Sequence, residues 1–422
     1  MDINRIKKSL AAINAYTTGN YGISRLAYTV EEQLAKKYFL QTCKKLGMET
    51  KVDTVGNIIA TLKGVDERLP SVAIGSHLDT VYNGGQFDGT LGVVAGLEII
   101  RTFVEEGIRT LHSIELIVFS CEESSRFNIS TLGSKAMLGE VDLVSIRNIK
   151  DRDNIKLEDA FQMIGLNIED YRLSERGENE IKVFFELHIE QGKKLISKQK
   201  TIGIVTGIAA PLRLSISIEG ESAHSGTTGM DMRKDALLAA SEFVLLVEKA
   251  ALEELEFETV ATVGVLEVTP GAINVVPGLV NLKVDIRGIN IESRNRVLER
   301  IKDTIDAIEI KRKVTISIDW LYEEEPVLMD DEISNNIKLL CEKLELSYLL
   351  MPSGAGHDSM NMAKRWPTSL IFVPSVNGLS HHPDEYTKDD DLYAGIQVLK
   401  AAVETYAIIV NEEGELLWNQ DK

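Results

Sequence analysis

Four short apolar segments, each followed by side chains of a metal-binding type, place the strongest constraint on how this chain folds. The segments are residues 72–74, 114–119, 183–187 and 369–373. Apolar, β-branched runs of this length predict strands that are buried on both faces, as in a parallel sheet. In open α/β sheets the side chains at the carboxyl ends of the strands face the ligand crevice. The pattern therefore predicts an α/β fold with one site assembled from several strand ends.

The residues at these strand ends are histidines and carboxylates. A lone histidine at a strand end is more often a structural residue, and the glycines after residue 74 lack the spacing of a phosphate-binding loop. Four such strand ends together favour a metal site instead. Imidazole and carboxylate ligands suit zinc, manganese, cobalt or nickel. The strand-end residues are His77, Asp79 and Asp88 after the first segment, Glu122 and Glu123 after the second, His188 after the third, and His381 and His382 after the fourth.

Composition narrows the class of protein. A chain of 422 residues predicts two domains, and its excess of 65 Asp and Glu over 46 Lys and Arg disfavours nucleic acid or an anionic membrane as partner. The cysteines Cys43, Cys121 and Cys341 are scattered and form no C-x-x-C pair, which fits a reducing cytoplasm. We see no signal peptide and no apolar run of membrane-spanning length. The protein is expected to be soluble and cytoplasmic.

The pattern changes at about Pro211. Residues 212–219 alternate strictly between apolar and polar, which predicts a half-solvated strand. A helix over 234–252, strands over 260–268 and 280–286, a second helix and a strand over 314–318 follow. The order β-α-β-β-α-β is the split βαβ, or ferredoxin-like, arrangement. We therefore expect a discontinuous metal-binding catalytic domain of residues 1–211 and 323–422, with an inserted domain of residues 212–322.

The expected insert carries polar side chains of its own. His224 lies in the run GESAHSGTTGMDMRKDAL, Asn274 lies in a turn, and Arg287 ends the third strand of the insert. An isolated arginine in DIRG is usually a surface residue. Three such groups in one small domain favour instead a lid that recognises an anionic substrate, because the planar guanidinium binds both oxygens of a carboxylate.

The ordered motifs resemble those of the amidase, hydantoinase/carbamoylase family. That family comprises N-carbamoyl-L-amino-acid hydrolases, allantoate amidohydrolases and β-ureidopropionases, and it is related to dinuclear zinc aminoacylases and peptidases. The resemblance covers nearly the whole chain and implies a zinc-exopeptidase-like catalytic domain. The motifs are GSHLDTVYNGGQFDGTLGV, CEESSRF, ELHIEQG, GESAHSGTTGMDMRKDA, PGAINVVPG, DIRG, SGAGHDS and LSHHPDEYT.

The resemblance implies a site with two divalent metal ions per subunit, with zinc, manganese, cobalt and nickel all open. Asp88 would bridge the two ions. His77 and His188 would complete the first metal site, and Glu123 and His381 the second. The doublet His381-His382 leaves the ligand formally open, and the family pattern Ser-His-x-Pro selects His381.

The resemblance also implies roles for residues that are not ligands. Asp79 would orient His77 through its carboxylate. Glu122 would be the general base toward water activated by the two cations. Ser125 stands where many relatives have glycine or alanine, which would alter the pocket and leave the metal ligands untouched.

Substrate contacts are implied from both domains. Gln191 and the SGAGHDS loop with Gly356 would contact the substrate, and His224 would stabilise the oxyanion. His224, Asn274 and Arg287 would come from the lid, at least partly from a partner subunit. The resemblance thus implies a homodimer formed through the lid domain.

Several functions stay open from the sequence. N-carbamoyl-L-amino-acid hydrolysis is the favoured activity, and allantoate amidohydrolase and β-ureidopropionase are the alternatives, since Arg287 suits the carboxylate of any of these substrates. A dinuclear dipeptidase or aminoacylase is a further alternative. His188 argues against it, because peptidase-type relatives usually have a carboxylate at this ligand position. A binding protein with a relic metal site would lack a ligand or the base, and all of them are present.

Overall fold

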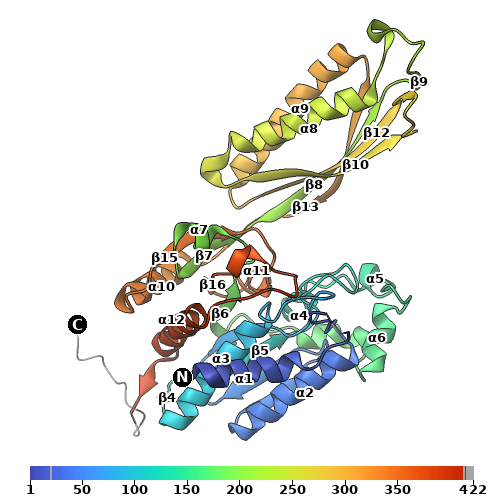
Figure 1. Ribbon diagram of the computed structural model, residues 1–422. Helices are drawn as coiled ribbons and strands as arrows, with labels where there is room; N and C mark the ends of the chain where they lie inside the picture. The colour runs from blue at the N-terminus through green and yellow to red at the C-terminus, as the bar shows by residue number, and fades with distance from the viewer. Residues whose placement is uncertain (20, 412–413, 415–422) are drawn as a thin grey trace. The chain divides into compact units, whose positions relative to one another are not determined.

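The computed structural model describes residues 1–19, 21–411 and 414, which form two compact units (Figure 1). Unit 1 consists of Met1–Thr206, Met329–Met351 and the chain from His357 on, and unit 2 of Gly207–Leu328 and Pro352–Gly356. Unit 2 is thus slightly larger than the expected insert. The segment Pro352–Gly356 joins it because Ser353 O accepts from Ala209 N (2.8 Å) and Gly354 O accepts from Arg287 Nη1 (3.0 Å).

The larger sheet, most of which lies in unit 1, has a parallel centre and antiparallel edges. Its strand order is β1-β2-β5-β3-β6-β16-β7-β14, with β15 paired to β7, and the pairs β5–β3, β3–β6 and β6–β16 are parallel. A mixed α/β fold with a mostly parallel central sheet is confirmed. The strands are β1 (Glu49–Val52), β2 (Ile58–Leu62), β3 (Ser71–His77), β5 (Ile114–Phe119), β6 (Ile181–Ile189), β7 (Ile202–Ile208), β14 (Val327–Leu328), β15 (Tyr348–Ser353) and β16 (Thr368–Val373).

Helices cover this sheet and bury its apolar side chains in a large core. α3 packs on β3 and β6, and its first three turns are entirely buried, which explains why its sequence is apolar on all sides. Gly107, at φ 67°, ends α3 in the left-handed conformation that favours glycine. The longer helices are α1 (Ile3–Asn14), α2 (Val30–Lys45), α3 (Thr90–Glu106), α10 (Asp331–Lys343) and α12 (Asp389–Ala407).

Shorter elements connect these layers. Residues 54–57 form a turn in which the Asp53 carboxylate accepts from Val55 N and Asn57 N. The short elements are β4 (Arg109–Thr110), α4 (Leu132–Met137), α5 (Leu143–Ile146), α6 (Leu157–Met163), η1 (Ile168–Ser174), α7 (Lys194–Lys198), α11 (Asp358–Met362), η4 (Val376–Gly378) and β17 (Ile409–Val410).

Unit 2 is an antiparallel sheet with two helices packed against it. The strand order is β10-β12-β8-β13, and the chain order is β-α-β-β-α-β. Leu212, Leu214, Ile216 and Ile218 of β8 are buried in a core with α8 and α9. The elements are β8 (Ala210–Glu219), β9 (Ala223–His224), η2 (Met230–Met232), α8 (Ala236–Leu252), η3 (Leu255–Phe257), β10 (Val260–Thr269), β11 (Val275–Val276), β12 (Leu279–Gly288), α9 (Ile291–Arg312) and β13 (Thr315–Glu323).

None of the helices in the described part of the chain is long and apolar enough to cross a membrane.

Candidate metal centre

The candidate metal centre lies in unit 1, where the parallel strands end. Strand ends on one edge of a parallel sheet converge, so residues far apart in the sequence meet there. The six side chains are His77 at the end of β3, Asp88 before α3, Glu122 and Glu123 after β5, His188 within β6 and His381 after β16.

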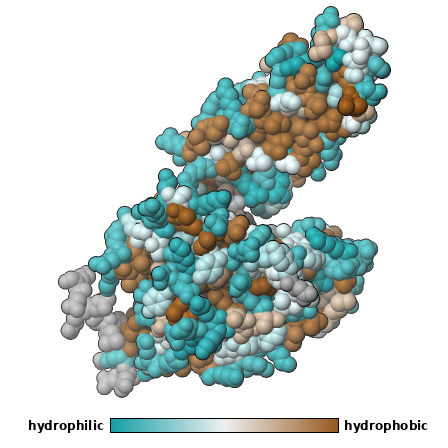
Figure 2. Space-filling model, in the orientation of Figure 1, coloured by the Kyte–Doolittle hydropathy of each residue, from teal (hydrophilic) through white to brown (hydrophobic). Residues whose placement is uncertain are grey.

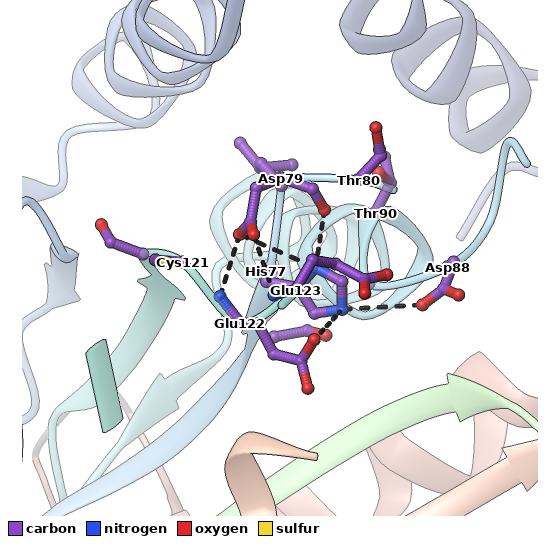
Figure 3. Close-up of polar contacts among 12 residues, drawn as sticks. His77, Asp79, Thr80, Asp88, Thr90, Cys121, Glu122 and Glu123 are labelled. Atoms are coloured by element: carbon purple, nitrogen blue, oxygen red, sulfur yellow. Dashed lines mark hydrogen bonds and ion pairs between the residues drawn. The ribbon is translucent and has the colours of Figure 1, made fainter. Parts of the chain in front are cut away.

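Asp88 lies between the histidines of this cluster. Its Oδ1 is 3.1 Å from His188 Nε2 and 3.6 Å from His77 Nε2. Its Oδ2 is 3.2 Å from His381 Nε2, which also lies 3.3 Å from Glu123 Oε1. The two carboxylate oxygens of Asp88 thus face two different groups of side chains, and Figure 3 shows the contact with His77.

These contacts define two groups with the spacing of metal ligands. His77, Asp88 and His188 form one group, and Asp88, Glu123 and His381 form the other, with the ligand atoms of each group within 4.8 Å of one another. Both groups contain only imidazole nitrogens and carboxylate oxygens, the ligands that Zn²⁺ and related divalent ions bind. The structure points His381 of the histidine doublet at Asp88. The assignment of each ligand stays a prediction.

Electrostatics also fit a cationic occupant. Burial raises the pKa of the Glu122 carboxyl well above its usual range, and nearby Glu123 and Asp358 raise it further, against the opposing effect of His77. Although burial opposes it, the three surrounding histidines hold the pKa of Asp88 well below its usual range. Buried carboxylates that repel one another are stabilised by bound cations. The donor set therefore fits divalent metal ions.

A third ligand-like group, Glu186, His188 and His357, is less suited to a metal ion. Glu186 Oε1 accepts from Ser76 Oγ (2.9 Å), and Oε2 accepts from the hydroxyl and the N–H of Ser359 (2.5 and 3.1 Å). Both oxygens of this carboxylate therefore already have donors.

The backbone at the site is held in uncommon conformations. Cys121, Gln191 and His381 have φ values of 54°, 58° and 55°, in the left-handed region that non-glycine residues seldom adopt. The turn before α3 needs glycine for a different reason, which is space: a Cβ at Gly89 would lie 2.4 Å from the His77 ring. Local backbone strain of this kind is characteristic of functional sites.

Asp79 holds His77 differently from our expectation. His77 Nδ1 lies 2.8 Å from the main-chain oxygen of Asp79, whereas the Asp79 carboxylate is 3.9 Å from Nδ1, too far for a hydrogen bond. That carboxylate instead accepts from the backbone N–H groups of Glu122 (3.3 Å) and Glu123 (3.0 Å), as Figure 3 shows. The Asp79 carboxylate therefore lies within ion-pair distance of His77 without a hydrogen bond to it, because the chain turns after β3 and directs the Asp79 side chain toward the end of β5. The role of Asp79 in orienting His77 stays a prediction.

Gln191 contacts the centre through its amide. Its Nε2 donates to Asp88 Oδ2 (2.9 Å) and Ser380 Oγ (3.2 Å). Its Oε1 is buried and has no hydrogen-bond partner among the described residues. A buried acceptor without a donor is costly, so this oxygen is suited to receive an N–H from a ligand.

Sequence reasoning missed Glu385 and Ser380. Glu385 Oε1 accepts from Phe87 N (2.8 Å) and Asp88 N (3.1 Å), and Ser380 Oγ donates to Asp88 Oδ2 (3.0 Å). Burial, followed by the charge of Asp88, raises the pKa of Glu385 to about 7. Both residues lie in the motif LSHHPDEYT, and a glutamate four residues after a candidate ligand was the only available signal.

The expected site residues of unit 2 lie in two places. His224 and Asn274 are neighbours, because β9 pairs with β11 and Ser225 N donates to Asn274 O (3.0 Å). Arg287 is near the C-terminal end of β12, where Asp285 binds its guanidinium (2.9 and 3.1 Å) and Gly354 O accepts from it. Leu279, at the N-terminal end of β12, is eight residues from Arg287, or about 27 Å along a strand. Gly356 ends the segment Pro352–Gly356 of unit 2.

Comparisons with known proteins identify the family. The family model described as Peptidase family M20/M25/M40 matches residues 73–405. A crystal structure of an amidase of the hydantoinase/carbamoylase family from Burkholderia multivorans superposes with a TM-score of 0.90 at 33% sequence identity, covering 96% of this chain and 98% of that one.

Curated relatives match over nearly their full length. An uncharacterized hydrolase of Haemophilus influenzae is 42% identical, covering 96% of this chain and 98% of the relative. An N-carbamoyl-L-amino-acid amidohydrolase of Pseudomonas sp. strain NS671 is 37% identical (92% and 94% covered), and the allantoate amidohydrolase of Escherichia coli is 36% identical (90% and 91% covered).

The chain belongs to the M20/M25/M40 family, in its hydantoinase/carbamoylase amidase branch. It is a hydrolase that acts on non-peptide C–N bonds. The resemblance seen in the sequence motifs is thereby confirmed.

Proposed function

We propose that this chain hydrolyses N-carbamoyl-L-amino acids to the free amino acid, carbon dioxide and ammonia. One observation carries the proposal: Asp88 faces two groups of ligand-type side chains through its two oxygens, and the Glu122 carboxylate lies 3.6 Å from His77 at the same place. This arrangement suits two divalent ions with a general base beside them.

Different residues of the chain have different roles in the reaction. Two bound divalent ions would supply an acidified water and polarise the carbamoyl carbonyl. Glu122, whose carboxylate lies 3.6 Å from His77, takes a proton from the attacking water and returns it to the leaving nitrogen. The unpartnered Oε1 of Gln191 accepts an N–H of the ureido group.

Unit 2 supplies the recognition of the acid group. Arg287 binds the substrate carboxylate with guanidinium N–H groups that are not bonded to Asp285. Asp285 keeps the guanidinium oriented. His224 and Asn274 stabilise the oxyanion that develops on the carbonyl oxygen.

Other substrates of the same chemistry are the alternatives. Allantoate and N-carbamoyl-β-alanine also combine a ureido group with a carboxylate, and relatives named for carbamoyl-amino-acid and for allantoate hydrolysis match at 37% and 36% identity. A dipeptidase or aminoacylase is the more distant alternative, and the histidine at position 188 speaks against it.

We further infer that the enzyme is a homodimer with shared active sites. His224 lies in the β9–β11 pair, beyond the end of the four-stranded sheet at Leu279, whereas Arg287 lies near the other end of that sheet. One copy of unit 2 therefore cannot present both to a single small substrate. A second copy supplies the missing group. His224 and Asn274 would act on the partner's substrate and Arg287 on that of its own subunit.

The surface of unit 2 supports this inference. Leu238, Leu245 and Leu252 are 41%, 64% and 55% exposed and repeat every seven residues along α8, a spacing that presents one apolar stripe. We call these three residues the α8 stripe. β10, on which α8 packs, is an edge strand of the sheet. Figure 2 shows hydrophobic side chains gathered over this part of unit 2. Exposed apolar surface of this kind is typical of an interface.

The state of the cysteines supports a proposal on the cellular location. Cys43, Cys121 and Cys341 are free and buried, as in proteins of a reducing compartment, and we propose a cytoplasmic enzyme.

A substrate panel tests the proposed function. Purified enzyme is stripped with a chelator, reloaded with Zn²⁺, Mn²⁺, Co²⁺ or Ni²⁺, and assayed for ammonia and for free amine. The panel contains N-carbamoyl-L-amino acids, allantoate, N-carbamoyl-β-alanine, dipeptides and N-acetyl-amino acids. We expect the highest kcat/KM on an N-carbamoyl-L-amino acid and no activity without metal. Cleavage of dipeptides alone, or full activity of stripped enzyme, contradicts the proposal.

A further inference from the structure

Arg25 is a fully buried arginine whose hydrogen bonds, among the described residues, all go to uncharged oxygens. Its Nε donates to Leu78 O (2.6 Å), Nη1 to Ile13 O (3.0 Å) and Tyr16 O (3.3 Å), and Nη2 to Thr90 Oγ1 (3.0 Å). Asn14 Oδ1 lies at the edge of hydrogen-bond range of both terminal nitrogens (3.5 and 3.4 Å). The guanidinium is thus surrounded by acceptors from three parts of the chain.

Two of these parts carry candidate metal ligands. Leu78 stands between His77 and Asp79 at the exit of β3, and Thr90 is the first residue of α3, two residues after Asp88. Figure 3 shows Thr90 and Asp88 beside this exit. The guanidinium therefore links the segment of His77 directly to the segment of Asp88.

The third part is the N-terminal segment of the chain. Ile13 and Asn14 end α1, and Tyr16 follows it. The backbone of Arg25 adds two further links: its N–H donates to Thr80 Oγ1 (2.9 Å), and Thr80 N donates to its carbonyl oxygen (2.9 Å). Arg25 thus fixes the exit of β3 from both sides of Asp79.

A charge at this position is hard to explain by stability alone. Burying a guanidinium without a carboxylate partner costs several kcal/mol, and an apolar side chain of similar volume would avoid that cost. Burial lowers the pKa of Arg25 to about 10, with Asp79 opposing the shift, so the group is charged at neutral pH. What a neutral residue would not provide is five donors held in one rigid plane.

We propose that Arg25 is a positioning residue that holds His77 and Asp88 at the separation required by one divalent ion. The inference rests on the metal centre proposed above. Metal–ligand distances tolerate deviations of only about 0.2 Å, so the relative position of two ligand-bearing segments determines affinity. Residues that support ligands without binding the metal typically contribute about 10- to 100-fold in affinity.

The test is the metal affinity of the stripped full-length protein with Arg25→Lys. Lysine keeps the charge but presents its donors from one atom, so it cannot reach Leu78, Thr90 and the end of α1 together. Zn²⁺ and Mn²⁺ affinities are measured by titration against a competing chelator, and thermal unfolding of the stripped protein is recorded in parallel. We expect the affinity for one of two ions to fall about 10- to 100-fold. Excess metal should restore most of kcat with little change in KM.

Arg294→Lys is the matched control. Arg294 is also buried (2% exposed), but it lies in unit 2, where it donates to Glu324 O and pairs with Glu323 (2.9 Å). We expect this variant to lose stability and to keep wild-type metal affinity. Equal metal affinity in Arg25→Lys and the wild type, or an equal loss in both variants, overturns the proposal.

Thr90→Val provides the test should Arg25→Lys fail to fold. Valine keeps the shape of the buried threonine and removes only the acceptor for Nη2. We expect a smaller fall in metal affinity, and an unchanged affinity overturns the proposal. Because no substrate is involved, these measurements stand apart from the choice among ureido substrates. A wild-type protein that binds no divalent ion would instead contradict the proposed function itself.

Discussion

The roles of the residues around Asp88 depend on which of their atoms make each contact. The Asp79 carbonyl contacts His77, while its carboxylate binds the backbone of Glu122 and Glu123. One residue thereby connects the exit of β3 to the exit of β5. This link holds the backbone from which the Glu122 side chain, on which the proposed chemistry depends, extends.

Glu122→Gln separates chemistry from metal binding. Glutamine preserves shape but cannot take a proton, so we expect kcat to fall about 10²- to 10⁴-fold. Metal content and apo stability should stay close to those of the wild type. Steady-state assays and metal analysis check both statements. Glu106→Gln, an exposed residue at the end of α3, should behave as wild type. A fully active Glu122→Gln enzyme would refute the assignment of the base.

Glu254 gives a pH-dependent contribution to the stability of unit 2. Arg296 and Arg300 each bind its carboxylate at 2.6 Å, and these hydrogen bonds, that of Arg296 foremost, lower its pKa to about 2. A lowered pKa in the folded state stabilises the protein above the ordinary value near 4.5. This contribution is lost as the pH falls from about 4.5 through about 2.

We therefore expect Glu254→Gln to lower the free energy of unfolding by about 2 kcal/mol at pH 7. The difference from wild type should shrink as the pH falls below about 4.5. Denaturant unfolding at a series of pH values measures it, with exposed Glu256→Gln as the control. A difference independent of pH would show that the ion pairs with Arg296 and Arg300 are not its source.

Among the secondary-structure elements, the ends of the strands contribute more to the candidate site than the strands themselves. β5 and β16 have nearly the bounds expected from their apolar runs, whereas β6 continues to Ile189, so that His188 lies within the strand instead of after it. The turns that follow carry Cys121, Gln191 and His381 at positive φ. Periodicity reports burial, but it contains no information on such turns, because their conformation is imposed by contacts between segments.

The α8 stripe predicts the dimer interface. Leu245→Glu places a charge in the middle of the stripe. We expect the dissociation constant of the dimer to rise by at least about tenfold. The variant should stay folded, because Leu245 is 64% exposed within the subunit. Sedimentation equilibrium measures the change. Val144→Glu, at an apolar position of unit 1 that is more exposed (84%), should leave the dimer intact. An unchanged dimer in Leu245→Glu would place the interface elsewhere.

For the whole molecule, the opposite positions of His224 and Arg287 in unit 2 make a quantitative prediction. We expect His224→Ala and Arg287→Ala homodimers each to be nearly inactive. In a mixed dimer, one site receives an intact Arg287 from its own subunit and an intact His224 from the partner. Because half of the randomly mixed dimers are heterodimers with one such site of two, activity should return to about a quarter of wild type.

Mixing the two variants after dissociation, followed by ammonia assay, measures this recovery. Mixing each variant with Glu122→Gln serves as a comparison, since Glu122 belongs to unit 1. No recovery in a mixture shown to contain heterodimers would contradict the sharing of sites.

The sequence by itself determined which residue types gather at the candidate metal centre and the family to which the chain belongs. Apolar runs followed by histidine or carboxylate predict convergent strand ends, because sheet geometry brings such ends together. Alternating polarity likewise marked the strands of unit 2. These features depend only on local periodicity and on the chemistry of side chains.

Only the tertiary structure decided which atoms meet. It placed the Asp79 carboxylate on the Glu122–Glu123 backbone and Glu385 against the turn of Asp88. It also brought Arg25, which lies 53 residues before its partner Leu78, between the two segments that carry the candidate ligands His77 and Asp88. Such contacts join segments distant in the chain, and their geometry follows from how the packed core fixes the backbone, which no local pattern encodes.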